Sequence, residues 1–379
     1  MYKTLEVQKS ILQIGLQQTV EKFKLDCKNL GHKVMLKYNQ INSSNMHEEV
    51  RESRGLVLDS DTWEVMSMPF KRFYTHDDYY AAKLDLTKTV FTEKRDGTLI
   101  QVYWDYITKS WAINTMFSEC EDKFFGGEYT LKEIFLNIAF DLGFSFNYLD
   151  SETTYIFELT SPYKKVVVKY ETPELRLIGA RYLLGDLKEH NFEKLCYTAE
   201  RIKIPIVETY KFSSIEECLK SFQGKSYNFE GYVAFDGLNR IKIKNPAYVA
   251  IHLTKRSQDE FLDVSNPHIF LDIVKQNEIG EFSSSFPHAK ELIEDLYEKY
   301  NDLLRKLHSV DEEIEKPFDD SAEAKKAFSA SIMTTLAKYG IKSELSSLFF
   351  MKNNGKILSI EEYLQKYDNK KLLKILKNG

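Results

Sequence analysis

The feature that most constrains the fold is a change of sequence periodicity near residue 255. Between residues 85 and 250, short apolar and alternating runs are separated by turn residues, which is typical of antiparallel strands. Helical spacing follows in three stretches, 289–307, 321–338 and 360–377. We therefore expect an α+β fold. Residues 1–254 would form a domain built on antiparallel sheets with flanking helices, and residues 255–379 an all-helical domain.

Local patterns predict particular elements of the first domain. Apolar residues at helical spacing predict a helical conformation for roughly the first 30 residues. Residues 55–59 and 63–67 alternate on either side of the turn Ser60-Asp61-Thr62, which predicts a hairpin. Residues 165–170 are also expected to form a strand.

Composition limits the class of protein. The 379 residues are 43% hydrophobic, enough for two domains with cores of their own. No apolar run approaches the ~18–20 residues of a membrane span, so we expect no membrane association. Residues 1–256 hold 35 basic and 35 acidic side chains, so any nucleic-acid surface must be a local basic patch.

The four cysteines indicate the compartment. None of them pairs at CxxC spacing, so the sequence suggests neither a zinc site nor a disulfide framework. This pattern predicts a reducing, cytoplasmic location. The cysteines are Cys27, Cys120, Cys196 and Cys218.

The hexapeptide Glu93-Lys94-Arg95-Asp96-Gly97-Thr98 joins two apolar runs and contains a candidate nucleophile. A lysine that attacks a phosphate has to be neutral, and neighbouring cations or a metal ion favour its neutral form. The same cations stabilise the charge that develops on the phosphate oxygens. The hypothesis that Lys94 is a nucleophile therefore requires more lysines on one strand face, a metal-binding carboxylate and a carboxylate for a ribose.

The chain contains candidates for each requirement. Lys242 and Lys244 alternate with isoleucines, so both side chains lie on the same strand face. Glu230 precedes a predicted strand, and Glu158 lies within an apolar strand. Each has an ordinary structural explanation, such as a solvated strand face or a salt bridge. The complete set in this order is much less expected by chance than any one member.

The ordered set resembles the covalent nucleotidyltransferase superfamily of ATP-dependent ligases and capping enzymes, and most closely its phage-type RNA ligase 1 family. The resemblance covers residues 33–256. The segments that carry it, besides the Lys94 hexapeptide, are Tyr38-Asn39, residues 51–57, 69–74, 157–162, 166–170, 230–233 and 242–244, Tyr248 and His252.

The resemblance implies a role for each of these residues. Lys94 would carry AMP as a phosphoramide, and Lys242 and Lys244 would contact the α-phosphate. Glu158 would hold the ribose, and Glu230 would help to place a divalent metal, Mg²⁺ or Mn²⁺. The nucleotide-binding set would be Tyr38, Arg54, Lys71, Arg72, Lys94, Gly97, Glu158, Lys242, Lys244 and Tyr248.

The resemblance implies more specific roles for the remaining members of this set. Arg54, Lys71 and Arg72 would receive the β- and γ-phosphates, and Tyr248 would line the phosphate side of the pocket. Asp96-Gly97 would form the turn that aims the lysine at the phosphate, rather than a second catalytic pair.

The sequence departs from the family pattern in two places. The lysine that the family places before an aromatic pair is replaced by Arg72, with Lys71 one position earlier. Arginine offers a planar fork where lysine offers a point charge, so the phosphate geometry can differ. The strand after the nucleophile usually ends in a basic residue and a glycine, whereas residues 114–118 read Asn-Thr-Met-Phe-Ser. A phosphate or RNA contact is therefore lost or supplied elsewhere.

The resemblance implies an ATP-dependent RNA ligase that joins 3′-OH and 5′-phosphate ends through a lysyl-AMP and then an RNA-adenylate. We expect a monomer that repairs broken RNA, plausibly nicked tRNA, with a possible separate kinase-phosphatase to heal the ends. The helical domain would help to select the RNA. The alternatives are a DNA ligase or guanylyltransferase relative, and an inactive RNA- or nucleotide-binding module of the same fold.

Overall fold

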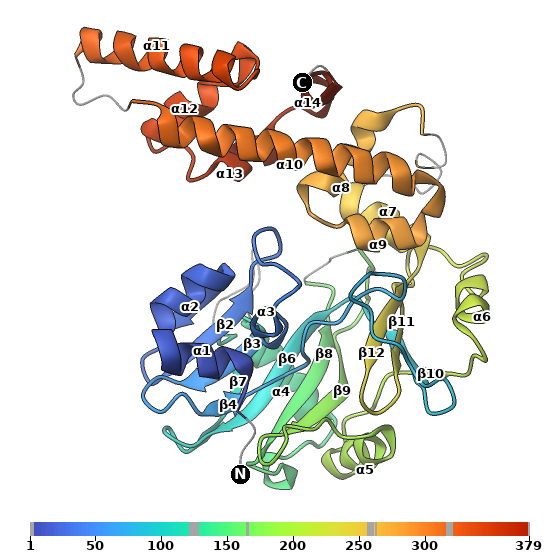
Figure 1. Ribbon diagram of the computed structural model, residues 1–379. Coiled ribbons are helices and arrows are strands. Elements are labelled where there is room, and N and C mark those ends of the chain that lie inside the picture. Colours follow the sequence, from blue (N-terminus) through green and yellow to red (C-terminus); the bar gives the residue numbers. More distant parts are fainter. Residues whose placement is uncertain are drawn as a thin grey trace. The chain divides into compact units, whose positions relative to one another are not determined.

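The computed structural model describes residues 4–120, 129–163, 167–255, 261, 264–315 and 321–377. Its internal contacts divide the chain into two compact units, Met1–His252 and Leu253–Gly379. The first unit contains the strands and the second is helical (Figure 1), which confirms the predicted α+β class. No helix in the described part of the chain is long and apolar enough to cross a membrane.

The first unit contains three four-stranded sheets. All pairings between their named strands are antiparallel. Sheet A consists, in order, of β1 (Leu25–Asn29), β2 (Lys33–Tyr38), β3 (Arg54–Asp59) and β4 (Val65–Ser67). Sheet B consists of β10 (Thr209–Tyr210), β5 (Val90–Lys94), β11 (Gly231–Phe235) and β12 (Arg240–Lys244). Sheet C consists of β7 (Ser110–Asn114), β6 (Thr98–Asp105), β8 (Thr153–Thr160) and β9 (Glu174–Tyr182).

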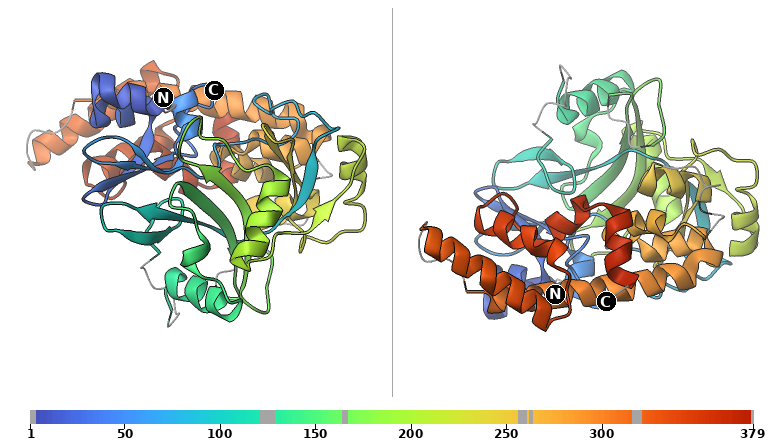
Figure 2. Two further views of the ribbon diagram at one scale, coloured as in Figure 1. Left: turned by 90° about the horizontal axis from the view of Figure 1, so that it is seen from below. Right: turned by 90° about the horizontal axis from the view of Figure 1, so that it is seen from above.

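Each sheet buries one face against helices. Sheet A packs on α1 (Glu6–Ile14) and α2 (Leu16–Phe23), and sheet B packs on α6 (Ile215–Lys220). Sheet C packs on α4 (Leu131–Asp141) and α5 (Phe192–Ile202), teal and light green in Figure 2. The short helices of this unit are α3 (Glu48–Glu52) and the 3-10 turn η1 (Phe146–Tyr148), and α7 (Pro246–Thr254) runs across the division between the units.

The second unit is organised around its longest helix, α10 (Lys290–Glu313). This helix buries one stripe of apolar side chains, which are Ile293, Leu296, Tyr300, Leu303, Leu307 and Val310. The other elements are η3 (Pro267–Phe270), α8 (Leu271–Lys275), α9 (Ile279–Ser285), η4 (Pro287–Ala289), α11 (Ala322–Lys338), η5 (Ser343–Leu345), α12 (Ser346–Asn353), α13 (Ile360–Lys366) and α14 (Asn369–Lys377).

The fold differs from the sequence expectations at two places in the first unit. Lys24 has a left-handed conformation (φ 53°) that ends α2, so the next five residues pair with β2 as strand β1 instead of extending a helix. The predicted strand 165–170 is also wrong for its described residues. Residues 164–166 lie outside the described residues, and residues 167–170 form no strand.

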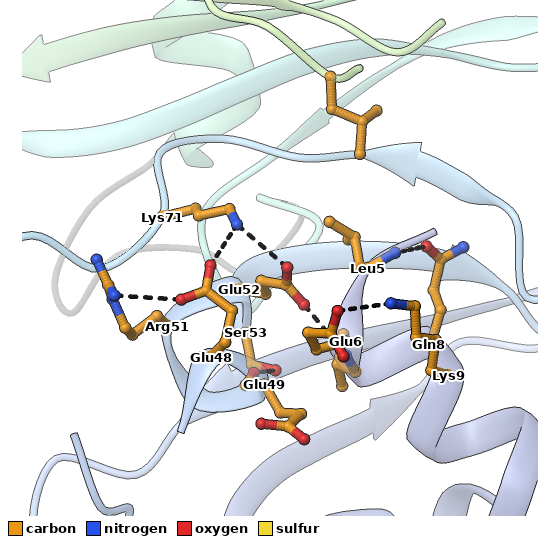
Figure 3. A network of polar contacts seen from close by, with 12 residues as sticks. Leu5, Glu6, Gln8, Lys9, Glu48, Glu49, Arg51, Glu52, Ser53 and Lys71 are labelled. Atoms are coloured by element: carbon orange, nitrogen blue, oxygen red, sulfur yellow. Dashed lines mark hydrogen bonds and ion pairs between the residues drawn. The ribbon is translucent and has the colours of Figure 1, made fainter. Parts of the chain in front are cut away.

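A polar network ties α1 and α3 to the loop after β4 (Figure 3). The carboxylate of Glu52 is buried, and it accepts a hydrogen bond from the Val7 backbone N–H at 3.1 Å. Burial raises the pKa of Glu52, and the nearby charge of Lys71 opposes that rise. The ammonium group of Lys71 lies 3.1 Å from Glu52 and 2.5 Å from Glu48. Lys71 therefore compensates the charge of a buried carboxylate.

We predict that Lys71→Met lowers the free energy of unfolding by about 3 kcal/mol, because it leaves Glu52 buried without its cation. Urea unfolding measures the change. The double variant Lys71→Met/Glu52→Gln should recover most of the loss. Lys9→Met removes an exposed ion pair with Glu6 and serves as the control, with little expected change. Equal effects of Lys71→Met and Lys9→Met would contradict the assigned role of Lys71.

Candidate active site

Lys94 is the last residue of β5, and strand register fixes its neighbours. Gly231 of β11 lies directly opposite both Lys94 and Lys244. Directly opposed residues project from the same face of an antiparallel sheet, and Gly231 adds no side chain between the two lysines. Both ammonium groups point to Glu230 Oε1, at 2.6 Å from Lys94 and 3.6 Å from Lys244. Two lysines and a buried carboxylate therefore meet at one end of sheet B.

Gly231 is required by close approach of the backbone. Its φ is +150°, and a Cβ atom there would lie 2.2 Å from the carbonyl oxygen of Ile243. Lys242 lies opposite Val233, two residues further along the same face. The structure thus places Lys242, Lys244 and Lys94 on one face of sheet B.

Asp96 anchors the turn that follows Lys94. Its buried carboxylate accepts hydrogen bonds from the backbone N–H groups of Val167 and Val168, at 2.8 and 2.7 Å. Its other oxygen accepts the hydroxyl hydrogen of Tyr248 at 2.9 Å. The Asp96 N–H donates to the hydroxyl of Tyr170 at 3.1 Å. These bonds explain why residues 167–170 form no strand, because two of their N–H groups are engaged by a side chain.

Glu158 of β8 lies close to the lysine turn. Burial raises the pKa of Glu158 to about 7. The neighbouring Glu230 raises it further, while Lys94, Arg54 and the Gly97 N–H act in the opposite direction. A Cβ at Gly97 would lie 2.6 Å from the Leu159 carbonyl oxygen and 2.9 Å from Glu158 Oε1. Glycine at position 97 thus lets the turn approach the carboxyl group closely.

A cavity of about 830 Å³, measured out to its open mouth, lies beside Lys94, and Glu230, Lys242 and Lys244 are not among the described residues that line it. It is lined by Lys94, Glu158 and Arg54. The Arg54 guanidinium lies 5.3 Å from the ring centre of Phe73, and its buried Nη1 has no hydrogen-bond partner among the described residues. A buried N–H without a partner is unfavourable unless a ligand or water accepts it.

The other predicted phosphate residues lie around a neighbouring cavity of about 1280 Å³. Arg72 lines it, 4.1 Å from the ring centre of Tyr38, and the buried Arg72 Nη1 has no hydrogen-bond partner in the described part of the chain. Lys71 also lines this cavity but pairs with Glu48 and Glu52. The predicted contacts of Lys71 and Arg72 with phosphates stay predictions.

Tyr248 and Glu230 are both buried, at 1% and 4% exposure. The Tyr248 hydroxyl donates to Asp96, and its ring centre lies 5.5 Å from the Lys244 ammonium. Tyr248 therefore supports the lysine turn from α7, and its predicted contact with nucleotide stays a prediction. No group of three or more histidine, cysteine or acidic side chains is arranged to hold a metal among the described residues.

Sequence reasoning missed Arg240. Its guanidinium lies 4.0 and 4.3 Å from the ring centres of Phe70 and Phe235, and Nη1 donates to Glu189 at 2.8 Å. Arg240 lines both cavities. The sequence did contain a signal for Arg240, because the alternation that places Lys242 and Lys244 on one strand face also places Arg240 on that face.

Comparison with known proteins identifies the family. A family model described as RNA ligase matches residues 52–248, just over half of the chain. The chain belongs to this RNA ligase family, which confirms the resemblance found in its motifs.

Individual proteins resemble this chain over different shares of their own length. The chain is 28% identical over 312 residues to the "Putative bifunctional polynucleotide kinase/RNA ligase" of Autographa californica nuclear polyhedrosis virus, covering 76% of this chain and 43% of that protein. It is 24% identical over 434 residues to the RNA ligase of Rhodothermus phage RM378, covering 96% and 93%. The solved structure of an archaeal ATP-dependent RNA ligase is 13% identical, with a TM-score of 0.43, covering 89% of this chain and 81% of that one.

The chain therefore spans less than half of the viral relative and most of the phage relative.

We predict a pH-dependent gain of stability for Glu158→Gln. Because the pKa of Glu158 rises from 4.5 to about 7 on folding, the folded protein takes up a proton, and its stability falls as the pH rises through this range. Glutamine cannot ionise. The variant should match the wild type near pH 4, below the unfolded pKa, and exceed it by about 3 kcal/mol at pH 8. Urea unfolding at both pH values measures this, and a pH-independent difference would contradict the raised pKa.

Proposed function

We propose that this chain is an ATP-dependent RNA ligase that acts through a lysyl-AMP and then an RNA-adenylate. The observation that carries the proposal is the meeting of Lys94 with Glu230 and Lys244 at one end of sheet B. Lys94 also lines a cavity together with Glu158 and Arg54. This chemistry fits a chain of the RNA ligase family.

In the first step, the Lys94 nitrogen attacks the α-phosphorus of ATP. A P–N bond forms, the bond to the leaving pyrophosphate breaks, and the nitrogen loses a proton. Glu230 Oε1, at 2.6 Å, is positioned to receive that proton. Lys242 and Lys244 stabilise the negative charge that develops on the α-phosphate, because they project from the same sheet face as the nucleophile.

Other residues would hold the rest of the nucleotide. Glu158 accepts hydrogen bonds from the ribose hydroxyls. The Nη1 groups of Arg54 and Arg72, which have no hydrogen-bond partner among the described residues, receive the β- and γ-phosphates, since arginine binds phosphate in a planar fork. Tyr38 holds the Arg72 guanidinium in place through its ring. Lys71 contributes positive charge nearby, reduced by its two carboxylate partners.

A divalent metal fits this donor set. Mg²⁺ is usually held by one or two carboxylates together with phosphate oxygens and water. Glu230 and Glu158 lie close enough for their charges to interact, so Glu230, with Glu158 nearby, would hold Mg²⁺ or Mn²⁺. When bound, the metal neutralises triphosphate charge.

The later steps join two RNA ends. An oxygen of the RNA 5′-phosphate displaces Lys94 from the adenylate, and the 3′-OH of the other end then displaces AMP. We propose broken tRNA as the substrate and a separate kinase-phosphatase as the source of ready ends. A relative whose name includes a polynucleotide kinase as well as an RNA ligase supports a link between end healing and ligation. We propose a monomer in a reducing cytoplasm, consistent with four cysteines that show no CxxC spacing in the sequence.

The helical unit is the candidate for RNA selection. Helix α14 buries Leu372, Ile375 and Leu376. Its exposed positions carry four lysines, Lys370, Lys371, Lys374 and Lys377. Such a face favours contact with a phosphate backbone.

Incubation with α-labelled ATP and Mg²⁺ tests the proposal. We expect an acid-labile, alkali-stable adduct between protein and AMP that passes its label to 5′-phosphorylated RNA. Lys94→Ala should form no adduct, whereas Lys88→Ala, at an exposed lysine just before β5, should form it normally. Absence of the wild-type adduct would indicate an inactive binding module. Labelling from GTP alone would indicate capping chemistry, and transfer only to DNA would indicate a DNA ligase.

We also predict that Lys244→Met slows single-turnover adduct formation by about 100-fold, the usual cost of removing one donor from a developing anion. Rapid quench with labelled ATP measures the rate. A rate within about twofold of the wild type would contradict a role for Lys244 at the α-phosphate.

A further inference from the structure

Lys37 is paired across sheet A with a residue of the active-site cavity. It is the residue before Tyr38 in β2, and it pairs with Arg54 of β3 just after a shift of register between Leu36 and Lys37. Opposed side chains lie on the same face of the sheet, so the two cations are neighbours. Arg54 lines the cavity with Lys94, whereas Lys37 is not among the described residues that line it. Lys37 is thus paired with a residue that lines the cavity.

Lys37, Arg54 and Arg72 each lie against an aromatic ring. Its ammonium is 5.7 Å from the ring centre of Phe117, Arg54 is 5.3 Å from Phe73, and Arg72 is 4.1 Å from Tyr38. In the described part of the chain, no carboxylate forms an ion pair with Lys37. Cations that alternate with aromatic rings are typical of surfaces that bind single-stranded nucleic acid.

The segment after β7 approaches the same place. The Gln101 side-chain amide donates to the carbonyl oxygens of both Gly55 and Thr115, at 2.9 and 3.0 Å. A Cβ at Gly55 would lie 2.9 Å from the Cα of Met116. This segment lacks the basic residue that the motif pattern predicts there. The segment that lacks the charge follows β7 of sheet C, and its Phe117 ring lies against the Lys37 ammonium of sheet A.

We propose that Lys37 binds the 5′-phosphate of the RNA during AMP transfer, and that it supplies from β2 the positive charge that residues 114–118 lack. The inference rests on the proposed function. In that step a 5′-phosphate oxygen attacks the phosphorus of the lysyl-AMP, and a P–O–P bond forms. The P–N bond to Lys94 breaks, and its electron pair stays on the nitrogen, which takes up a proton. Lys37 offsets the repulsion between the incoming phosphate and the adenylate phosphate.

The test separates the two steps with labelled ATP and a 5′-phosphorylated RNA. Lys37→Gln should form lysyl-AMP within about twofold of the wild-type rate but transfer AMP to RNA about 10-fold more slowly, because one charge-assisted phosphate contact is lost. Lys37→Arg should retain most of the transfer rate. Lys211→Gln, at an exposed lysine of the same unit, is the matched control and should change neither rate.

A second variant tests whether the charge can be supplied from the other segment. Lys37→Gln/Met116→Lys should recover transfer, because Met116 lies against Gly55 beside Arg54. If the double variant did not recover AMP transfer, this would contradict the idea that a lysine at position 116 can replace Lys37. Transfer at the wild-type rate in Lys37→Gln, or equal losses in both steps, would overturn the inference. If the wild type formed no lysyl-AMP, the proposed function itself would fail.

Discussion

The buried carboxylate of Asp96 is the interaction on which the active-site geometry depends. A buried carboxylate is stable only when its oxygens are hydrogen-bonded, and Asp96 accepts bonds from Val167, Val168 and Tyr248. These partners come from the segment after β8 and from α7 after β12, so one side chain joins three distant parts of the chain at the turn beside Lys94. The position of the lysine is thus fixed by tertiary contacts.

Strand register adds the second constraint. Gly231 stands opposite Lys94 on one side and Lys244 on the other, so β11 separates the lysines without placing a side chain between them. Glu230 then reaches both ammonium groups. A carboxylate with two lysines keeps the positive charges close together without strong mutual repulsion. An incoming triphosphate would meet cations that are already in place, which is the preorganisation that electrostatic catalysis requires.

The sequence predicted those features that depend on the local alternation of apolar and polar residues and on turn residues. Alternation placed Lys242 and Lys244 on one face, and the turn residues between 55–59 and 63–67 located the hairpin of β3 and β4. It could not predict the partners of Asp96, because a side chain that binds backbone groups some 70 residues away leaves no local pattern. The sequence also could not separate the roles of Lys71 and Arg72. Although the two cations are adjacent in the chain, Lys71 pairs with two carboxylates and Arg72 lies against an aromatic ring.

The most direct measurement is the site of adenylylation. The protein would be incubated with ATP and Mg²⁺, digested under alkaline conditions that preserve a phosphoramide, and its peptides sequenced by tandem mass spectrometry. We expect one adenylyl group, on the peptide that contains Lys94, removed when the protein is first mixed with 5′-phosphorylated RNA. An adenylyl group on Lys242, Lys244 or another lysine, or no modification at any lysine, would contradict the central role of Lys94.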